Sequence, residues 1–357
     1  MLSIVADGAA KRKKRKDASR ILPEMAGCNT CRLLMTGGVI LLYWRQGLYV
    51  KTSGCAFRDL NYRVKGASLT MTQRIQQALE QAGEHARLET VQRVGGGSIN
   101  DSYYARTANQ AYFIKYQPNA PENFFDLETQ GLELIRETQS IAVPHVYALT
   151  EDTQGAYLIM AWVDGKPAAS TEWQLGDRIA ALHQSTGQWH GFSADTFVGT
   201  LPQPNGLFAS WLAYYRDQRL MRQLQLGIEQ GTMTGKRRER MEKLLENLHK
   251  WVPDDVAPAY LHGDLWGGNW LAGPDGEPYV IDPSFLYGDR HFELAFTEVF
   301  GGFGRDFYQA YQERFPLSAD YDAIKPVYQL YYLLVHLNMF GEVYGRSVDR
   351  ILQRYIG

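Results

Sequence analysis

The run from His262 to Asn269, which reads His-Gly-Asp-Leu-Trp-Gly-Gly-Asn, constrains this chain more than any other segment. Asn269 follows Asp264 by five residues, and an apolar segment then leads to Asp282. This spacing is typical of a phosphotransferase catalytic loop, in which one aspartate accepts the proton of the attacking hydroxyl. The asparagine and the second aspartate hold Mg²⁺ against the nucleotide phosphates. We expect Asp264 to be the catalytic base, Asn269 and Asp282 to be metal ligands, and Gly267–Gly268 to supply backbone freedom for the turn.

The overall composition is that of a globular protein and excludes some classes of partner. The chain has 357 residues, 45% hydrophobic and 21% charged, with a formal net charge of −2. That charge argues against a chain-wide nucleic-acid surface. The apolar run from Leu33 to Trp44 is shorter than the roughly 20 residues that span a bilayer. We therefore expect a small-molecule partner and neither nucleic acid nor membrane, and the length allows two domains or lobes.

Residues 1–70 differ in character from the remainder. Lys11–Lys16 is a basic block, and a basic block before an apolar run can imitate a signal peptide or bind nucleic acid or anionic lipid. A regular helical pattern begins at Met71. We favour Met71 as the natural start, with residues 1–70 a poorly structured extension or the product of an upstream start codon.

All three cysteines lie within this first segment. Cys28 and Cys31 form a C-x-x-C pair, and Cys55 is the third. A four-ligand zinc site would need a histidine, and none precedes Met71. Unpaired thiols are the favoured interpretation, which fits a reducing cytoplasm as the location of the protein.

The segment after Met71 predicts a helix followed by strands around a glycine-rich turn. Residues 72–81 have helical periodicity, and residues 88–94, 102–106 and 111–116 have the character of short strands. Gly95, Gly96, Gly97 and Ser98 follow the first of these strands. A glycine-rich turn between strands can lay backbone N–H groups over phosphates, although a flexible hairpin has the same pattern.

Lys115 lies in an apolar strand, and a strand lysine that points into a cleft can contact the α- and β-phosphates. Such a lysine needs a glutamate partner from a neighbouring helix. Residues 124–137 have a helical pattern, and Glu128 is the best placed candidate, with Glu133 and Glu137 as competitors. Solvated surface charges are the alternative interpretation of Lys115 and Glu128.

The apolar strand at residues 157–160 and the connector after it predict a hinge. Met160 would line the back of an adenine pocket, and the backbone groups of Ala161, Trp162 and Val163 would bond the adenine edge. An ordinary core strand and turn is the alternative. Beyond residue 170 the pattern is helical, with helices expected at 209–226, 237–251 and 328–339 and a structural role for His183.

Together these motifs resemble the fructosamine kinase (ketosamine-3-kinase) family, a relative of aminoglycoside phosphotransferases and choline kinases. The resemblance covers residues 71–357 and rests most on His-Gly-Asp-Leu-Trp-Gly-Gly-Asn and on the Ile-Asp-Pro that contains Asp282. It implies an α+β, two-lobed protein-kinase-like fold. Residues 71–163 would form a small lobe of antiparallel sheet plus helix, ending in the hinge. Residues 164–357 would form a larger, mainly helical lobe with the catalytic loop.

The resemblance also implies a reaction that uses ATP and Mg²⁺. Family members phosphorylate the 3-hydroxyl of a ketosamine, such as a ribulosamine, erythrulosamine or fructosamine, and later loss of the phosphate removes the sugar from the amine. Trp266 would form an aromatic floor for the sugar or pack the loop, and His262 would brace the loop. Asp289 would support the substrate side or cap the helix before Phe292. The protein would be a monomer or a homodimer.

Two other functions stay open at this point. One is phosphorylation of another small hydroxyl compound, such as an aminoglycoside, choline or methylthioribose. An aminoglycoside kinase is expected to line its acceptor site with many carboxylates. The other is a non-catalytic nucleotide-binding module.

Overall fold

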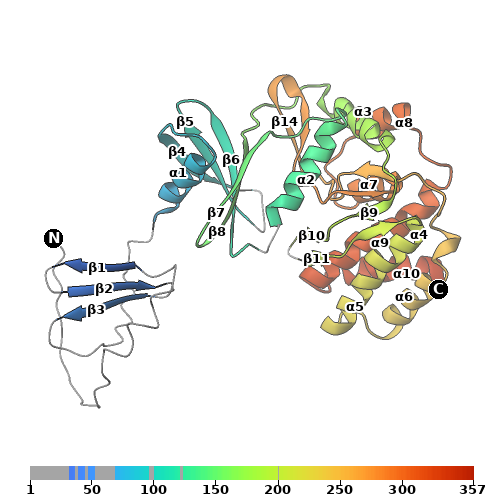
Figure 1. The fold of residues 1–357 in the computed structure, drawn as a ribbon. Helices are drawn as coiled ribbons and strands as arrows, with labels where there is room; N and C mark the ends of the chain where they lie inside the picture. Colours follow the sequence, from blue (N-terminus) through green and yellow to red (C-terminus); the bar gives the residue numbers. More distant parts are fainter. Residues whose placement is uncertain are drawn as a thin grey trace, which may run out of the picture. The chain divides into compact units, whose positions relative to one another are not determined.

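The computed structural model describes residues 32–36, 39–44, 47–52, 69–95, 100–120, 124–199 and 201–357. The chain divides into two compact units, Met1–Thr70 and Met71–Gly357 (Figure 1).

Within the first unit the described residues form three strands, β1 (Arg32–Thr36), β2 (Val39–Trp44) and β3 (Gly47–Thr52). They make one antiparallel sheet in the order β1-β2-β3. The basic block and the three cysteines lie outside the described residues. The expectation that residues 1–70 are a dispensable extension therefore stays a prediction.

The second unit opens with a helix and a five-stranded antiparallel sheet. The sheet has the order β4-β5-β6-β8-β7. The elements in chain order are α1 (Met71–Gln81), β4 (Leu88–Val94), β5 (Asp101–Thr107), β6 (Ala111–Pro118), α2 (Phe124–Glu137), β7 (Val146–Asp152) and β8 (Gly155–Ala161). The pattern predicted all of these to within two residues except β7, which the sequence reasoning missed.

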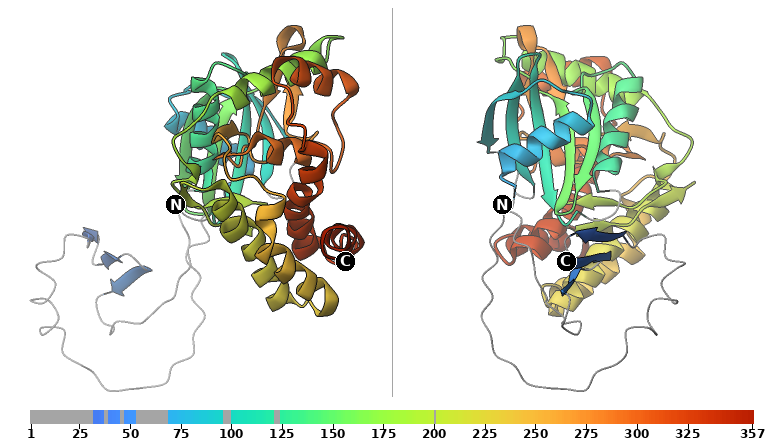
Figure 2. Two further views of the ribbon diagram at one scale, coloured as in Figure 1. Left: turned by 90° about the vertical axis from the view of Figure 1, so that its right-hand side faces the viewer. Right: turned by 60° about the vertical axis from the view of Figure 1, so that its left-hand side comes forward.

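Strand alternation gives this sheet two different faces. Even-numbered side chains of β6, such as Ile114, pack with Ile75 and Leu79 of α1. On the opposite face Met160 packs with Ile135 of α2. Two helices therefore flank the sheet, as Figure 2 shows from two sides. Because successive side chains of a strand point to opposite faces, Lys115 lies on the face that α2 covers.

The remainder of this unit is mainly helical. Its helical elements are α3 (Thr171–Gln184), α4 (Trp211–Tyr214), the π-helix η3 (Tyr215–Leu220), α5 (Met221–Gln230), α6 (Gly235–Glu246), the 3₁₀ turn η4 (Leu248–Lys250), the 3₁₀ turn η5 (Pro274–Gly276), α7 (Arg290–Thr297), α8 (Arg305–Arg314), α9 (Tyr321–Phe340) and α10 (Gly345–Ile356). With the antiparallel sheet before it, this arrangement confirms the predicted α+β, two-lobed fold.

Short strands connect the helices and carry the loops of interest. One sheet has the order β12-β9-β16-β13, and two hairpins pair β10 with β11 and β14 with β15. The strands are β9 (His190–Phe192), β10 (Thr196–Val198), β11 (Leu201–Gln203), β12 (Gly206–Phe208), β13 (Ala259–Leu261), β14 (Trp270–Ala272), β15 (Pro278–Val280) and β16 (Leu286–Gly288).

Three predicted helices have different limits in the structure. The helix expected at 209–226 is divided by the π-helical turn into α4, η3 and α5, and the one expected at 237–251 ends at Glu246. The last begins at Tyr321 rather than at 328. Tyr321 and Ile324 are buried, so tertiary packing extends α9 through Pro326, where the sequence alone favours a helix end.

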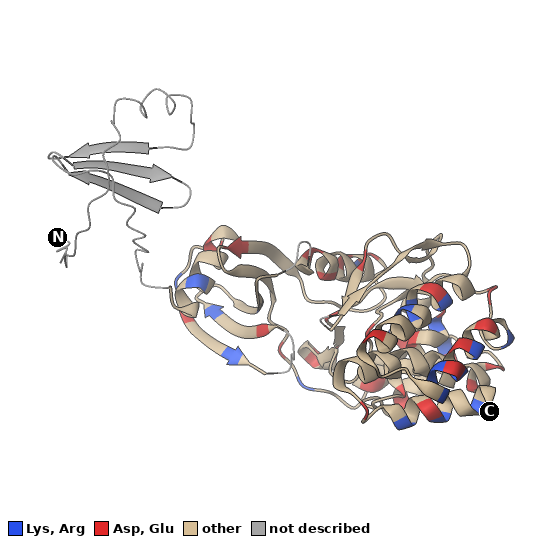
Figure 3. Cartoon of the chain, turned by 90° about the horizontal axis from the view of Figure 1, so that it is seen from below, with Lys and Arg blue, Asp and Glu red and all other residues tan. Residues whose placement is uncertain are grey.

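Acidic and basic side chains are interspersed on the helices near the C-terminus (Figure 3). Arg237 of α6, for example, pairs with Glu342 and with Asp349 of α10. The basic side chains of these helices are thus partly neutralised by acidic neighbours. Within the described residues, no helix is both long and apolar enough to cross a membrane.

Candidate active site

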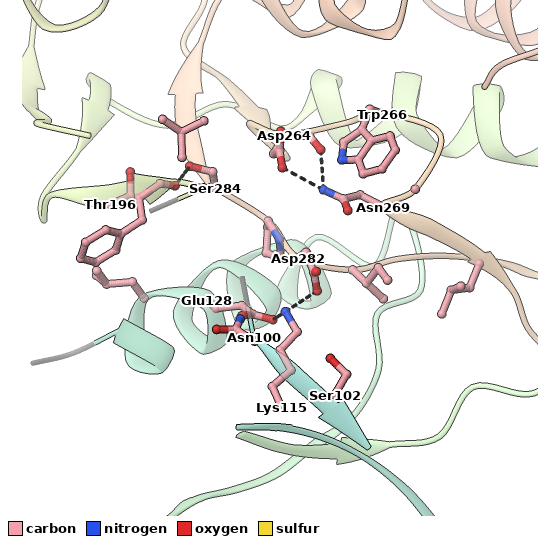
Figure 4. A pocket seen from close by; sticks show the side chains of 18 of the residues that line it. Asn100, Ser102, Lys115, Glu128, Thr196, Asp264, Trp266, Asn269, Asp282 and Ser284 are labelled. Carbon is pink, nitrogen blue, oxygen red and sulfur yellow. Dashed lines mark hydrogen bonds and ion pairs between the residues drawn. The ribbon is translucent and has the colours of Figure 1, made fainter. Parts of the chain in front are cut away.

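A cavity of about 760 Å³ collects the residues that the sequence singled out. Lys115 of β6, Glu128 of α2, the loop that follows β13 and the segment that follows β15 all line it (Figure 4). Residues from four separate parts of the second unit therefore meet in one cleft.

The β14–β15 hairpin brings the two predicted metal ligands to the same place. Trp270 lies opposite Val280 in the hairpin register, and the Ile281 N–H donates to the Asn269 carbonyl at 3.0 Å. Asn269 and Asp282 are therefore held at the open end of one hairpin. The twelve residues between them in the sequence become a short separation in space.

Asp264 is held by the asparagine that follows it. The Asn269 Nδ2 group donates to the Asp264 carboxylate at 3.0 Å and to its backbone carbonyl at 2.8 Å. Both amide protons are thus used within the loop, and the Asn269 Oδ1 is left as an acceptor. Burial, together with the nearby charge of Asp282, raises the pKa of Asp264 to about 7.

Lys115 lies between two carboxylates. Its Nζ is 2.8 Å from Glu128, so the predicted ion pair is present, and 2.5 Å from Asp282, a contact that was not predicted. Burial alone would lower the pKa of Lys115, but the attraction of Asp282 and Glu128 outweighs it and holds the pKa above its usual value. The lysine is therefore charged at neutral pH. The competitor Glu133 pairs with Arg136 instead.

Glycines of the catalytic loop provide space rather than unusual backbone angles. Neither Gly267 nor Gly268 has a positive φ, so the expectation of special turn geometry there was wrong. A Cβ on Gly268 would lie 2.3 Å from the Trp266 ring, and one on Gly267 would lie 2.8 Å from the backbone of Gly302. These positions are small because an aromatic ring and a second loop pass directly over them.

Left-handed backbone occurs on either side of the loop. Gly263 has φ 84°, and a Cβ there would lie 1.8 Å from the Ser284 carbonyl oxygen. Asp282 has φ 58°, a conformation that non-glycine residues rarely adopt. A residue held in this region costs about 1–3 kcal/mol and is typical of functional sites.

Glu293 of α7 is a buried residue whose role the sequence reasoning missed. It accepts the N–H groups of His262 and Gly263 and contacts His183 at 2.8 Å. Burial would raise the pKa of Glu293, but the hydrogen bond from His183 and its other partners hold it below the usual value. A buried carboxylate thus fixes the start of the catalytic loop. A glutamate in the apolar sequence Phe-Glu-Leu-Ala was the available signal.

The two histidines near the loop have structural partners, as expected. His183 contacts Tyr311 as well as Glu293. His262 lies 2.8 Å from the Ile281 carbonyl through Nε2 and accepts the Asp264 N–H at 3.3 Å through Nδ1. His262 therefore braces the loop against the segment that carries Asp282.

The predicted nucleotide-binding segments line the opposite side of the cleft. Met160, Ala161, Trp162 and Val163 all face the cavity, as does Gly95. The N–H of Ala161 donates to His145 and that of Trp162 to Ala111, so both groups are already used within the sheet. Gly96, Gly97 and Ser98 lie outside the described residues.

The two candidate substrate contacts differ in position. Trp266 lines the cavity and is 38% exposed. Asp289 is buried and does not line it. Its carboxylate caps α7 by accepting the His291 N–H and also accepts from the Tyr328 hydroxyl at 2.6 Å. Of its two interpretations, the helix cap is the one present, and no described contact brings it toward the substrate side.

Comparisons with known proteins agree on the family. A family model described as fructosamine kinase matches residues 70–357. A probable ketoamine kinase of Enterococcus faecium is 39% identical over 263 residues, which cover 73% of this chain and 94% of that protein.

Solved structures extend the likeness to the fold. A Haemophilus somnus protein named "putative fructosamine-3-kinase" has a TM-score of 0.72 and 28% identity, with 79% of this chain and 97% of that one covered. The aminoglycoside phosphotransferase APH(4)-Ia has a TM-score of 0.56 at 16% identity, covering 81% and 100%. At that identity the second likeness concerns the fold alone.

Proposed function

The chain belongs to the fructosamine kinase family, and we propose that it transfers the γ-phosphoryl group of ATP to the 3-hydroxyl of a ketosamine. The observation that carries the proposal is the convergence of Asp264, Asn269, Asp282 and Lys115 in one cleft. It is the set of groups that phosphoryl transfer requires, namely a base, two oxygen ligands for a metal and a cation for the phosphates.

Asp264 acts on the acceptor in this mechanism. Its carboxylate accepts a hydrogen bond from the 3-hydroxyl and takes the proton as the oxygen attacks the γ-phosphorus. The new bond joins that oxygen to phosphorus, and the bond between the γ-phosphorus and the bridging oxygen breaks to release ADP. The hydrogen bond from Asn269 keeps the carboxylate oriented toward the acceptor.

The donor set near Asp264 fits Mg²⁺ bound together with a nucleotide. Asp282 offers a carboxylate, and Asn269 offers the carbonyl oxygen that its amide bonds leave available. Among the described residues, no three His, Cys, Asp or Glu side chains form a metal site by themselves. That is the expected situation for Mg²⁺, which binds through one or two carboxylates, phosphates and water. When bound, the ion would neutralise charge on the transferred group.

Lys115 would hold the phosphates from the sheet side. It is 6% exposed and already charged, so its ammonium can exchange the Asp282 carboxylate for phosphate oxygens when a nucleotide enters. Glu128 stays as its partner at 2.8 Å and fixes the direction of the side chain. Electrostatic groups placed in advance in this way cost little reorganisation during the reaction.

The cleft offers little support for an aminoglycoside acceptor. Among the described residues that line it, the carboxylates are Glu128, Asp264 and Asp282, and all three belong to the phosphoryl-transfer group. A polycationic acceptor would need further carboxylates of its own. We further propose that the 3-phosphate then leaves by elimination, and that water hydrolyses the resulting imine to a deoxyosone and the free amine. We also propose that the reaction takes place in the cytoplasm.

An acceptor screen tests the function. The full chain would be incubated with ATP, Mg²⁺ and either a ribulosamine, a fructosamine, an aminoglycoside, choline or methylthioribose, and the products followed by ³¹P NMR. We expect phosphorylation of ketosamines at the 3-oxygen. Transfer to another hydroxyl, or to the other acceptors in preference, would contradict the proposal. Nucleotide binding without any turnover would favour a non-catalytic module.

A further inference from the structure

At the end of the cleft away from the sheet, four rings form a cluster that the mechanism above does not use. We call this cluster, Phe300, His336, Phe340 and Tyr344, the aromatic wall. The His336 ring lies at its centre, 4.4 Å from Phe300, 5.1 Å from Tyr344 and 5.6 Å from Phe340, measured between ring centroids. All four residues line the same cavity as Asp264.

The wall is joined to the catalytic loop by a backbone contact. Phe300 follows α7, and the next turn contains Gly302, whose backbone meets that of Gly267. A Cβ on Gly302 would lie 2.5 Å from the Gly267 Cα, so neither position accepts a side chain without movement. His336 and Phe340 come from the last turns of α9. The rings are thus fixed relative to the loop that carries Asp264.

Much of the wall is open to solvent. Phe300 is 41% exposed and Phe340 is 58% exposed, and Trp266, which lines the same cavity, is 38% exposed. Single exposed aromatics are common on protein surfaces, but a group of them that lines a cavity marks a site for an apolar ligand. Because these rings line the same cavity as Asp264, we expect the apolar ligand to be a part of the acceptor molecule.

The charges of the cleft restrict what that ligand can be. Among the described lining residues, Lys115 is the one lysine or arginine, and it is bound to Glu128 and Asp282. The wall itself contains neither a basic nor an acidic side chain apart from the histidine. An anionic group placed there would gain no cationic partner and would lose part of its hydration against the rings, which is unfavourable.

His336 adds one polar feature. Its Nδ1 lies 2.8 Å from the Tyr332 carbonyl, to which it donates, so Nε2 is the acceptor nitrogen of the neutral ring. Burial lowers the pKa of His336 below its usual value, which keeps the ring neutral at neutral pH. No hydrogen bond joins Nε2 to any described residue. It can therefore accept a hydrogen bond from an ammonium group.

We propose that the aromatic wall binds the amine-bearing side of the acceptor and selects carriers with an apolar or aromatic group on the nitrogen and no carboxylate beside it. This rests on the proposed ketosamine kinase function. The nitrogen of a ketosamine is a secondary ammonium, which is attracted to the faces of aromatic rings. Its N–H group can also donate a hydrogen bond to His336 Nε2. Its substituent would lie against Phe300 and Phe340.

One pair of acceptors tests the effect of the carboxylate charge by itself. Ribulosyl-phenethylamine and ribulosyl-phenylalanine differ by a single carboxylate next to the nitrogen. We expect kcat/KM to be about ten- to a hundred-fold higher for the phenethylamine derivative, the range by which one substituent changes acceptance by an apolar pocket. Ribulosyl-ethylamine, which lacks the ring, should fall between the two.

Substitutions in the aromatic wall provide a second test of the inference. Phe300→Ala and Phe340→Ala should lower kcat/KM for ribulosyl-phenethylamine by about tenfold and leave the KM for ATP unchanged. Trp173→Ala is the matched control, because Trp173 is 43% exposed on α3 but does not line the cavity. Melting temperatures of all three variants should stay near that of the full native chain.

A binding measurement keeps this inference separate from the proposed function. Calorimetric titration of ribulosyl-phenethylamine reports on the wall whether or not phosphate is transferred. If no ketosamine is phosphorylated, the proposed function fails, while loss of binding in Phe340→Ala still supports the wall.

Equal kcat/KM for the two matched acceptors, or equal binding by Phe340→Ala and the native chain, overturns the inference. The same holds if Phe340→Ala converts a native dimer to a monomer without changing turnover, because the wall would then be an interface between copies.

Discussion

The two ends of the cleft are built in different ways. At the charged end every side chain is fixed by another: Lys115 by Glu128 and Asp282, and Asp264 by Asn269. At the aromatic wall the rings contact each other, and Phe300 and Phe340 remain widely exposed. Phosphoryl transfer needs charges in defined positions, whereas an apolar carrier needs only a surface of suitable shape.

This comparison predicts that substitutions at the charged end reduce the rate for every acceptor, while those at the wall change which acceptor is preferred. Five predictions test first the charged end and its supports, and then a region outside both ends.

The largest effect is expected for Asp264→Asn. The substitution keeps the shape of the side chain and removes the proton acceptor, so kcat should fall by about 10²–10⁴ for all ketosamines. ATP affinity, measured by calorimetry, should stay close to that of the native chain. Asp322→Asn is the control, since that side chain is 93% exposed at the start of α9. Near-normal turnover by Asp264→Asn would remove the base from the mechanism.

Next come the two proposed metal ligands. Asn269→Ala and Asp282→Ala should each lower kcat/KM, by about 10²–10³ for Asp282, which also carries charge. The double variant should be little worse than Asp282→Ala alone, because groups that act on one ion are not additive. Activity would be measured across a Mg²⁺ series. Strict additivity of the two effects would argue against a shared ion.

A smaller effect is expected for Glu293→Gln, which acts through the loop. The amide can accept one of the two loop N–H groups but places a donor against the other, at a cost of about 1–3 kcal/mol. The melting temperature should fall, and kcat should drop by about 10–100-fold with little change in the KM for ATP. Glu313→Gln on α8 is the exposed control.

The same variant makes a prediction about pH. Because the pKa of Glu293 is lowered from 4.5, its contribution to stability is present above that value and is lost as the pH falls through the lowered pKa. Acid unfolding of the native chain should therefore be steeper than that of Glu293→Gln. Identical acid profiles for the two proteins would contradict this assignment.

The smallest effect is expected from removal of residues 1–70. Both ends of the cleft are built from residues after Met71, and the first of the two compact units ends at Thr70. A chain that starts at Met71 should match the full chain in melting temperature and in kcat/KM. A loss of activity, or unfolding many degrees lower, would show that the first unit supports the second.

Local spacing was enough to identify the charged end. Asp264, Asn269 and Asp282 lie within nineteen residues, and a tight loop followed by a hairpin can place them in only a few ways. The Lys115–Glu128 pair also followed from a strand and the next helix. The sequence did not reveal the contact between Lys115 and Asp282, which are 167 residues apart. The role of Asp289 could not be assigned either, because the sequence pattern of a helix cap does not differ from that of a substrate contact.

The sequence alone thus indicated the family resemblance, which depends on short spacings, and through that resemblance it predicted the fold and the residues proposed for phosphoryl transfer. Only the tertiary structure decided what surrounds them. Glu293 fixes the loop from a different element, and Gly267 and Gly302 are small because two backbones touch. The aromatic wall joins the end of α7 to the end of α9 and the turn after it, and in sequence its rings resemble any other core residues. Apolar side chains have no directional signature, so only their packing shows which of them remain exposed in a cleft.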